Sequence, residues 1–244
     1  MGSQAYQEQL QPVLGKGVLS SKMAGWKPFS EHTQQVLQSE FSDKRPLLIT
    51  DNYYTAAQLR FAGFKNRVIT LDRDKSVRDG RATQLALWRM DAGAIQDYLG
   101  QPALYINEDS TLLQADKIDL MTKMCHISQR VRPSTPLSLF AGDKAFSFYV
   151  IDELVMSEPG LTDRARPCPY PIVAWIDTPD NEALVRGQLT VAGWSYSEDL
   201  GIETVELMLN GETVHPLHYG VPRPDVVSNQ GVMSDPNRPN LGFT

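Results

Sequence analysis

The segment that most constrains the fold spans residues 46–72, because its pattern predicts a strand, a helix and a second strand in quick succession. Residues 47–50 form a short apolar run between a proline and an aspartate, which is typical of a buried strand. Residues 67–71 repeat that pattern and end at Asp72. The succession predicts a βαβ unit with parallel strands and a right-handed crossover.

The helix between these strands has recognisable start and stop signals. Asp51 or Asn52 can cap its first turn, because a short side-chain oxygen accepts hydrogen bonds from free backbone N–H groups. Apolar residues then recur on one helical face at Ala56, Leu59 and Ala62. Gly63 can end the helix in the left-handed conformation, which carries no Cβ penalty in glycine.

Polar and charged residues follow both strands, and open α/β sheets usually bind ligands at this carboxyl edge. The candidate ligand-binding residues are Asp51, Tyr53, Tyr54, Asp72, Lys75, Arg78 and Arg81. The three basic residues belong to a charged loop over 72–81 and can hold an anion, because guanidinium groups match phosphate or carboxylate. A solvated loop is the alternative. Likewise, Asp51 and Asp72 can share a metal or a proton, or serve only helix capping and loop solvation.

The rest of the first half continues the alternation of helices and strands. We expect helices over 30–41, with Ser30 as the cap, over 82–91 and over 112–124, and strands over 103–106, 127–131 and 146–154. Trp88 is expected in the core. The last strand has no cleanly polar face, which indicates cover on both sides.

A proline-rich stretch begins near residue 157, and the pattern beyond it is all-β. We therefore predict an α/β domain over 1–157, Rossmann-like with three layers and a mostly parallel sheet, a linker over 158–171, and a small antiparallel β-sandwich over 172–244. Strands are expected over 172–176 and 184–194, and a hairpin with a type I′ turn at Asn210-Gly211. Room for only four or five strands suggests a fragment whose last strands are missing.

Composition and motifs exclude several functions. The 244 residues carry a net charge of −6, which argues against nucleic acid as the main partner. No run approaches the length of a membrane-spanning helix. Dinucleotide and P-loop fingerprints and a complete nucleophile elbow are absent, so we predict no catalytic residue, cofactor or metal. Cys125 and Cys168 lack metal-ligand spacing, which leaves buried thiols or a disulfide; the latter requires an oxidising compartment.

Sets of residues along the chain resemble a known family. In the first half these are Gly25-Trp26, residues 49–59 (Ile-Thr-Asp-Asn-Tyr-Tyr-Thr-Ala-Ala-Gln-Leu), residues 68–72, Gln84-Leu85 and Trp88. This half resembles the soluble C-terminal region of bacterial membrane glycosyltransferases of the protein-mannosyltransferase and aminoarabinose-transferase type. Later residues look like a β-domain appended to such proteins: Pro167-Cys168-Pro169, residues 176–179, Gly193-Trp194, Gly201-Ile202, Val205, Gly211, Tyr219-Gly220, residues 223–226 and Gly242-Phe243.

The resemblance implies a non-catalytic, extracytoplasmic accessory region that is tethered to a membrane domain and helps to position an acceptor or partner. It implies a glycan or a polyprenyl-phosphate sugar as a ligand, and it makes a disulfide between the cysteines more plausible. The family's catalytic carboxylates lie in its membrane part, so none is assigned here. Two alternatives stay open: an enzyme acting at the sheet edge through Asp51, Tyr53, Asp72 and Arg78, or a carbohydrate-binding module with Trp194, Tyr196 and Tyr219 as stacking residues.

Overall fold

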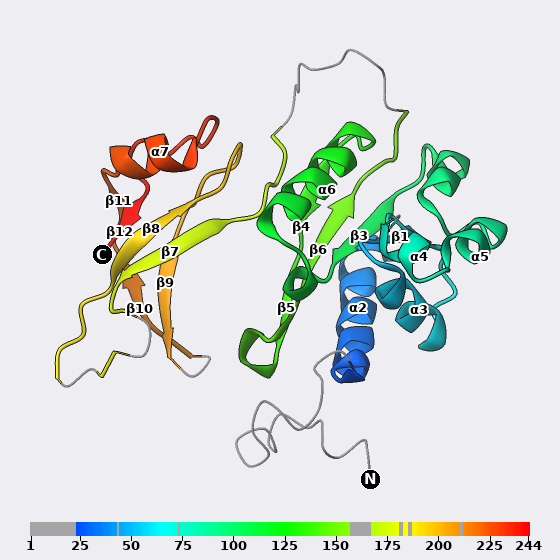
Figure 1. Cartoon of the computed structure of the whole chain (residues 1–244), viewed down its shortest axis with the longest axis horizontal. Helices are drawn as coiled ribbons and strands as arrows, with labels where there is room; N and C mark the ends of the chain where they lie inside the picture. Colours follow the sequence, from blue (N-terminus) through cyan, green and yellow to red (C-terminus); the bar gives the residue numbers. More distant parts are fainter. Residues whose placement is uncertain are drawn as a thin grey trace, which may run out of the picture. The chain divides into compact units, whose positions relative to one another are not determined.

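The computed structural model describes residues 23–42, 44–72, 74–156, 167–180, 183–184, 187–209 and 212–244. The chain divides into two compact units, Met1–Thr162 and Asp163–Thr244 (Figure 1). The first is mixed α/β, and the second contains separate antiparallel sheets and one described helix.

The first unit is built on a six-stranded mixed sheet. Strands β1 (Leu47–Thr50), β2 (Val68–Thr70) and β3 (Ala103–Asn107) form its parallel part, with β1 between the other two. The antiparallel part is β6 (Lys144–Ile151), which pairs with β3, and with β4 (Val131–Pro133) and β5 (Leu137–Leu139). The βαβ prediction is confirmed, whereas three of the sheet's five described pairings run antiparallel.

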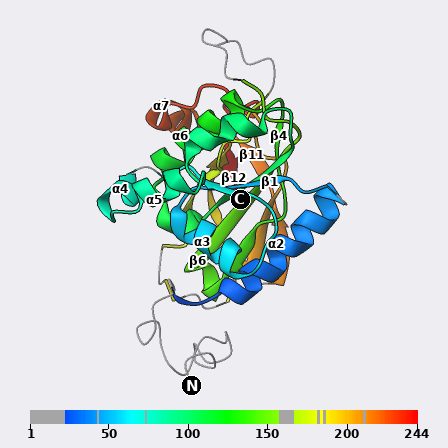
Figure 2. The ribbon, with the colours of Figure 1, turned by 90° about the vertical axis from the view of Figure 1, so that its right-hand side faces the viewer.

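Helices α2 (Trp26–Phe41) and α3 (Tyr53–Phe61) cover one face of this sheet, and α6 (Gln114–His126) lies apart from them (Figure 2). Their buried residues meet the strands in a single core: Phe29, Val36, Leu37, Phe41, Ala56 and Leu59 from the helices, with Leu48, Val68, Leu104, Ile106, Phe146, Phe148 and Val150 from the sheet. Every described position of β6 is at least half-buried, as expected for a strand covered on both sides.

Helix α2 begins earlier than the sequence predicts. Gly25 is its N-cap in the left-handed conformation, with φ of 79°, and Ser30 lies inside the helix, where its hydroxyl donates to the carbonyl of Trp26 at 2.7 Å. A Cβ on Gly25 would lie 2.8 Å from Leu139 Cδ1. The predicted cap at Ser30 was wrong because the helix already begins at Trp26, directly after Gly25.

Three further predictions for the first unit need correction. The charged loop contains helix α4 (Asp74–Arg78), which starts because the Asp72 side chain accepts from two backbone N–H groups, those of Lys75 at 3.0 Å and Ser76 at 3.3 Å. The strand predicted over 127–131 begins only at its last residue, as β4, and is preceded by an isolated bridge between Ser128 and Leu154. Trp88 is 56% exposed instead of buried, because it follows α5 (Ala82–Leu87) at the outer edge of the sheet.

Short 3-10 helices complete this unit: η3 (Ala92–Tyr98), η4 (Asp109–Thr111) and η5 (Phe140–Gly142). The helix predicted over 112–124 exists as α6, shifted by two residues. The strand predicted over 103–106 is β3, with Asn107 added to its end.

The second unit contains a four-stranded and a two-stranded antiparallel sheet in its described part. The first has the order β11 (Tyr219–Val221), β12 (Gly242–Phe243), β8 (Ala192–Tyr196) and β7 (Val173–Thr178). The second pairs β9 (Val205–Leu209) with β10 (Glu212–Leu217), as the hairpin prediction requires; its turn at Asn210-Gly211 lies outside the described residues. Helix α7 (Pro224–Gln230) was not predicted.

Two predictions for this unit were too simple. Of the strand expected over 184–194, only its end is extended in the described residues, as β8, in which Gly193 faces Ile176 of β7. The strands approach so closely there that a Cβ on Gly193 would lie 2.1 Å from the carbonyl oxygen of Trp175. The count of six described strands also exceeds the four or five expected.

Candidate functional site

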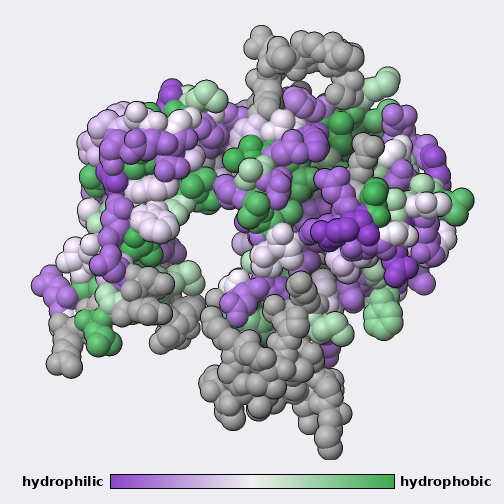
Figure 3. Space-filling model, in the orientation of Figure 1, coloured by the Kyte–Doolittle hydropathy of each residue, from purple (hydrophilic) through white to green (hydrophobic). Residues whose placement is uncertain are grey.

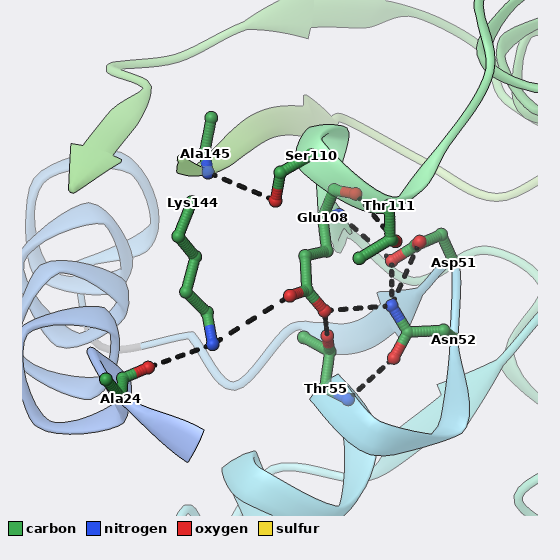
Figure 4. A network of polar contacts seen from close by, with 9 residues as sticks. All are labelled: Ala24, Asp51, Asn52, Thr55, Glu108, Ser110, Thr111, Lys144 and Ala145. Atoms are coloured by element: carbon green, nitrogen blue, oxygen red, sulfur yellow. Dashed lines mark hydrogen bonds and ion pairs between the residues drawn. The ribbon is translucent and has the colours of Figure 1, made fainter. Parts of the chain in front are cut away.

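The carboxyl ends of the parallel strands carry a connected group of buried polar side chains, which we call the rim network: Asp51, Asn52, Thr55, Glu108 and Lys144 (Figure 4). Asn52 is the N-cap of α3, where its Oδ1 accepts from the backbone N–H of Thr55 at 2.8 Å. The sequence left Asp51 and Asn52 open as caps, and the structure assigns that role to Asn52. Asp51 is thereby free to make contacts toward the neighbouring strand.

Asp51 is buried at the end of β1 and receives three hydrogen bonds. Asn52 Nδ2 donates to both carboxylate oxygens, at 3.1 and 3.0 Å, and the backbone N–H of Glu108 donates at 3.1 Å. Burial nevertheless raises the pKa of Asp51 to about 6, and the nearby Glu108 charge adds to the rise. The desolvation of a carboxylate outweighs its hydrogen bonds here.

Glu108 follows β3 and connects the network to the sheet's other half. Its Oε2 accepts from Asn52 Nδ2 and from the Thr55 hydroxyl, both at 3.2 Å. Its other oxygen, Oε1, lies 3.8 Å from Lys144 Nζ. The carboxylate therefore joins the helix α3 side to the first residue of β6.

Lys144 is 1% exposed, which is unusual for a lysine. Its ammonium donates to the carbonyl of Ala24 at 2.9 Å and lies 3.5 Å from the ring centroid of Trp26. Burial lowers the pKa of Lys144 to about 8, against the opposing effect of Glu108. The hydrogen bond to Ala24 and the cation–π contact with Trp26 together fix the start of α2 against β6.

Beside the rim network, the predicted tyrosines meet a carboxylate that the sequence did not single out. The hydroxyls of Tyr53 and Tyr54 donate to Asp79 Oδ2 at 2.8 and 3.1 Å, and Arg78 Nε donates to Asp79 Oδ1 at 3.1 Å. These donors lower the pKa of Asp79, with Tyr53 contributing most. The two rings are stacked, with their centroids 4.1 Å apart.

The remaining candidates have separate roles. Asp72 caps α4 through Oδ1, and its buried Oδ2 has no hydrogen-bond partner in the described part of the chain. Lys75 lies near enough to lower the pKa of Asp51 slightly, and Arg81 precedes α5. The carboxylate that interacts with Asp51 is Glu108, and Asp72 has the helix-capping role that was the alternative to sharing a metal or proton with Asp51. Among the described residues, no group of three or more metal-ligating side chains could hold a metal ion.

A second set of polar side chains lies buried on β3, near Asp51. Tyr105 of β3 is fully buried, and neither its hydroxyl nor the side-chain amide of Asn107 has a hydrogen-bond partner in the residues that the structure describes. Burial raises the pKa of Tyr105 well above its usual value, and the Asp51 charge raises it further. The tyrosine therefore stays protonated and can act only as a neutral hydrogen-bonding group.

Sequence reasoning missed Glu108 and Lys144, although each left a signal. Glu108 follows a predicted strand, as Asp51 and Asp72 do. Lys144 shares the face of Phe146 and Phe148 once the strand is extended backward by two residues. A lysine in phase with buried aromatics indicates a buried charge with a partner.

The aromatic residues proposed as a glycan platform serve the core of the second unit. Trp194 and Tyr196 stack with centroids 6.0 Å apart and pack against Val226, Val232 and Leu241. The Tyr219 hydroxyl donates to the carbonyl of Ser195 at 2.8 Å, and burial raises its pKa to about 12. These contacts occupy the rings within the protein.

The state of the cysteines bears on the compartment. Cys125 and Cys168 are both disulfide-bonded, and the chain has no free cysteine. In the described residues, no helix combines the length and apolar character needed to cross a bilayer.

Comparisons with protein-family models, with curated proteins and with solved structures gave no match to this chain. The functional argument therefore depends on the residues and their geometry.

Proposed function

We propose that this chain is a non-catalytic, extracytoplasmic accessory region of a lipid-linked-sugar glycosyltransferase, tethered to that protein's membrane domain. It helps to position an acceptor, a glycan or the polyprenyl-phosphate sugar near the membrane active site. The proposal starts from the sequence resemblance, most of whose first-half residues lie in β1, α3 and β2.

The observation that carries the non-catalytic part is the internal use of the rim network. Asp51 accepts from Asn52 and from the backbone N–H of Glu108, and the Glu108 carboxylate accepts from Asn52 and Thr55. Lys144 is bound to Glu108 and Ala24. A general base or nucleophile needs a free lone pair directed at a substrate. Groups saturated by their own chain instead stabilise the edge of the sheet.

The extracytoplasmic part is supported by the disulfide-bonded cysteines. Disulfides persist in oxidising environments such as the periplasm and the cell surface, and they are rare in the cytosol. A mixed sheet with helices against it, followed by antiparallel sheets, also fits the expected Rossmann-like three-layer domain and small β-sandwich.

The test has a genetic and a biochemical arm. The reading frame on either side of this sequence should encode a run of apolar membrane spans upstream; a frame without them would refute the proposal. The purified chain should transfer no sugar from a polyprenyl-phosphate donor to an acceptor in detergent. Measurable transfer by the wild-type chain that disappears in Asp51→Asn, but persists in the exposed-carboxylate control Asp74→Asn, would replace the accessory role with catalysis.

One observation favours the second candidate, an enzyme acting at the sheet edge. A buried carboxylate with a pKa of about 6 beside a second carboxylate is typical of acid–base sites. In that case Asp51→Asn would abolish an activity while the chain remains folded. In the accessory role, the same substitution changes stability alone.

A further inference from the structure

A groove of about 730 Å³ lies along the outer edge of the sheet in the first unit. One wall is a face of α3, which presents Tyr53, Ala57 and Arg60 at helical spacing. The other wall is formed by α5 and the residues on either side of it: Arg81, Gln84, Leu85, Trp88, Arg89 and Met90. Arg67 and Val68 close it from the side of β2. The groove is separate from the buried rim network.

The charged lining of this groove is entirely basic. Arg60, Arg67, Arg81 and Arg89 are exposed, and no carboxylate belongs to the lining. Arg89 is bound to Asp97, and Arg67 Nε donates to the Tyr98 hydroxyl at 3.0 Å. For Arg60 and Arg81, the described residues supply no side-chain partner. In a chain with a net charge of −6, this concentration of guanidinium groups is a local exception.

The floor of the groove is apolar. Val68 and Leu85 are buried there, Met90 is half-buried, and the ring of Trp88 is 56% exposed. In the space-filling view, the surface over α4 and α5 has strongly hydrophilic residues beside hydrophobic ones (Figure 3). A ligand that suits the groove therefore combines a negative charge with an apolar face.

The edge of β2 adds backbone hydrogen-bonding groups. Leu48 N donates to Arg67 O, and Leu71 N donates to Thr50 O, so β2 uses alternate peptide groups to pair with β1. This alternation turns the N–H and C=O of Val68, a residue of the groove's lining, away from β1, while the next outward N–H, that of Thr70, donates to the carbonyl of Met90 at 2.8 Å. They can orient a hydroxyl-rich ligand, as can the side-chain amide of Gln84.

We propose that this groove binds an anionic sugar, a pyranose ring that carries phosphate or carboxylate. The guanidinium groups of Arg60 and Arg81 bind the oxyanion in a forked geometry, which arginine provides and lysine does not. The apolar face of the ring packs on Trp88, and its hydroxyls bond to Gln84 and the Val68 backbone. The choice of a sugar rests on the proposed function, whereas the negative charge and the apolar face follow from the lining of the groove.

The test is a binding titration of the full chain with three probes: glucose 1-phosphate, trigalacturonate and neutral maltotriose. Isothermal calorimetry measures affinity, and the fluorescence of Trp88, compared with a Trp88→Phe variant, reports the location. The test variant carries both Arg60→Gln and Arg81→Gln, and both arginines are exposed. The control is Arg130→Gln, which removes a charge from an exposed arginine outside the groove.

We expect one or both anionic probes to bind saturably and maltotriose to bind at least about ten-fold more weakly, since a hydrogen bond to a charged group changes affinity by that order. The double variant should lose roughly ten-fold or more in affinity, whereas Arg130→Gln should bind like the wild type. Glucose 1-phosphate alone would identify a sugar-phosphate ligand, and trigalacturonate alone an acidic glycan. No binding of either anion, equal binding of maltotriose, or an unchanged affinity in the double variant would each overturn the proposal.

Discussion

The substitution Asp51→Asn tests the electrostatics of the rim network through the dependence of stability on pH. The pKa of Asp51 is raised from 3.8 to about 6 in the folded protein because the side chain is buried. The folded state therefore holds a proton between these values that the unfolded chain has released. Stability from this group is fully present below pH 3.8 and is lost as the pH rises through about 6.

The shift of about two pKa units corresponds to about 3 kcal/mol of unfolding free energy. Asparagine has nearly the same shape and does not titrate. The difference in unfolding free energy, variant minus wild type, should accordingly rise by about 2.4 kcal/mol between pH 4 and pH 7, because the unfolded aspartate is already partly ionised at pH 4. Subtraction removes the contributions of other titrating groups, provided that they do not interact with this site.

Urea denaturation followed by circular dichroism, at half-unit pH intervals, measures this difference. The exposed carboxylate Asp74 provides the matched control, and its asparagine variant should stay within about 0.5 kcal/mol of the wild type. A difference for Asp51→Asn that is flat across this range would refute the reasoning. A difference that falls with pH would show that hydrogen bonds outweigh burial.

Three further predictions concern single contacts. Lys144→Met leaves the Glu108 carboxylate buried without its cation and should lower the unfolding free energy, measured in urea, by about 3–5 kcal/mol. Adding Glu108→Gln to this variant should recover part of the loss. An equal loss in the single and the double variant would contradict this prediction. Gly193→Ala should disrupt β7–β8 pairing, which hydrogen exchange would detect as lost protection of the backbone amides of these strands. Gly220 has a φ of 112° but open space around it, so Gly220→Ala should lower the unfolding free energy by only about 1 kcal/mol. A thiol assay on the denatured, unreduced chain should find no free cysteine, and reduction should lower stability by about 2–5 kcal/mol; a full complement of thiols would exclude the bond.

The parts of the fold that the sequence predicts best are those whose signals are local. For β1, α3 and β2, a cap at Asn52, a left-handed Gly63 and short apolar runs all agree, and each works within a few residues. Ser30 was misjudged because a capping residue type also occurs inside helices, where its hydroxyl bonds to the preceding turn.

The site was harder to predict because it is assembled from distant segments. Glu108 and Lys144 acquire their roles only when β3 and β6 pair, because the two residues lie far apart in the sequence. Trp88 was expected inside because apolar spacing reports which face of a helix is apolar. It does not report that β2 is an edge strand with little beyond it to bury the ring.

The position of β6 has a consequence for synthesis on the ribosome. This strand pairs with β3, β4 and β5, yet among the described strands of the first unit it is the last to leave the exit tunnel. Until it arrives, β3 has one side without a partner, and such an open strand readily pairs with another nascent chain. The interval between the emergence of these two strands is thus when the chain most needs a chaperone, and slowing translation across it should increase aggregation.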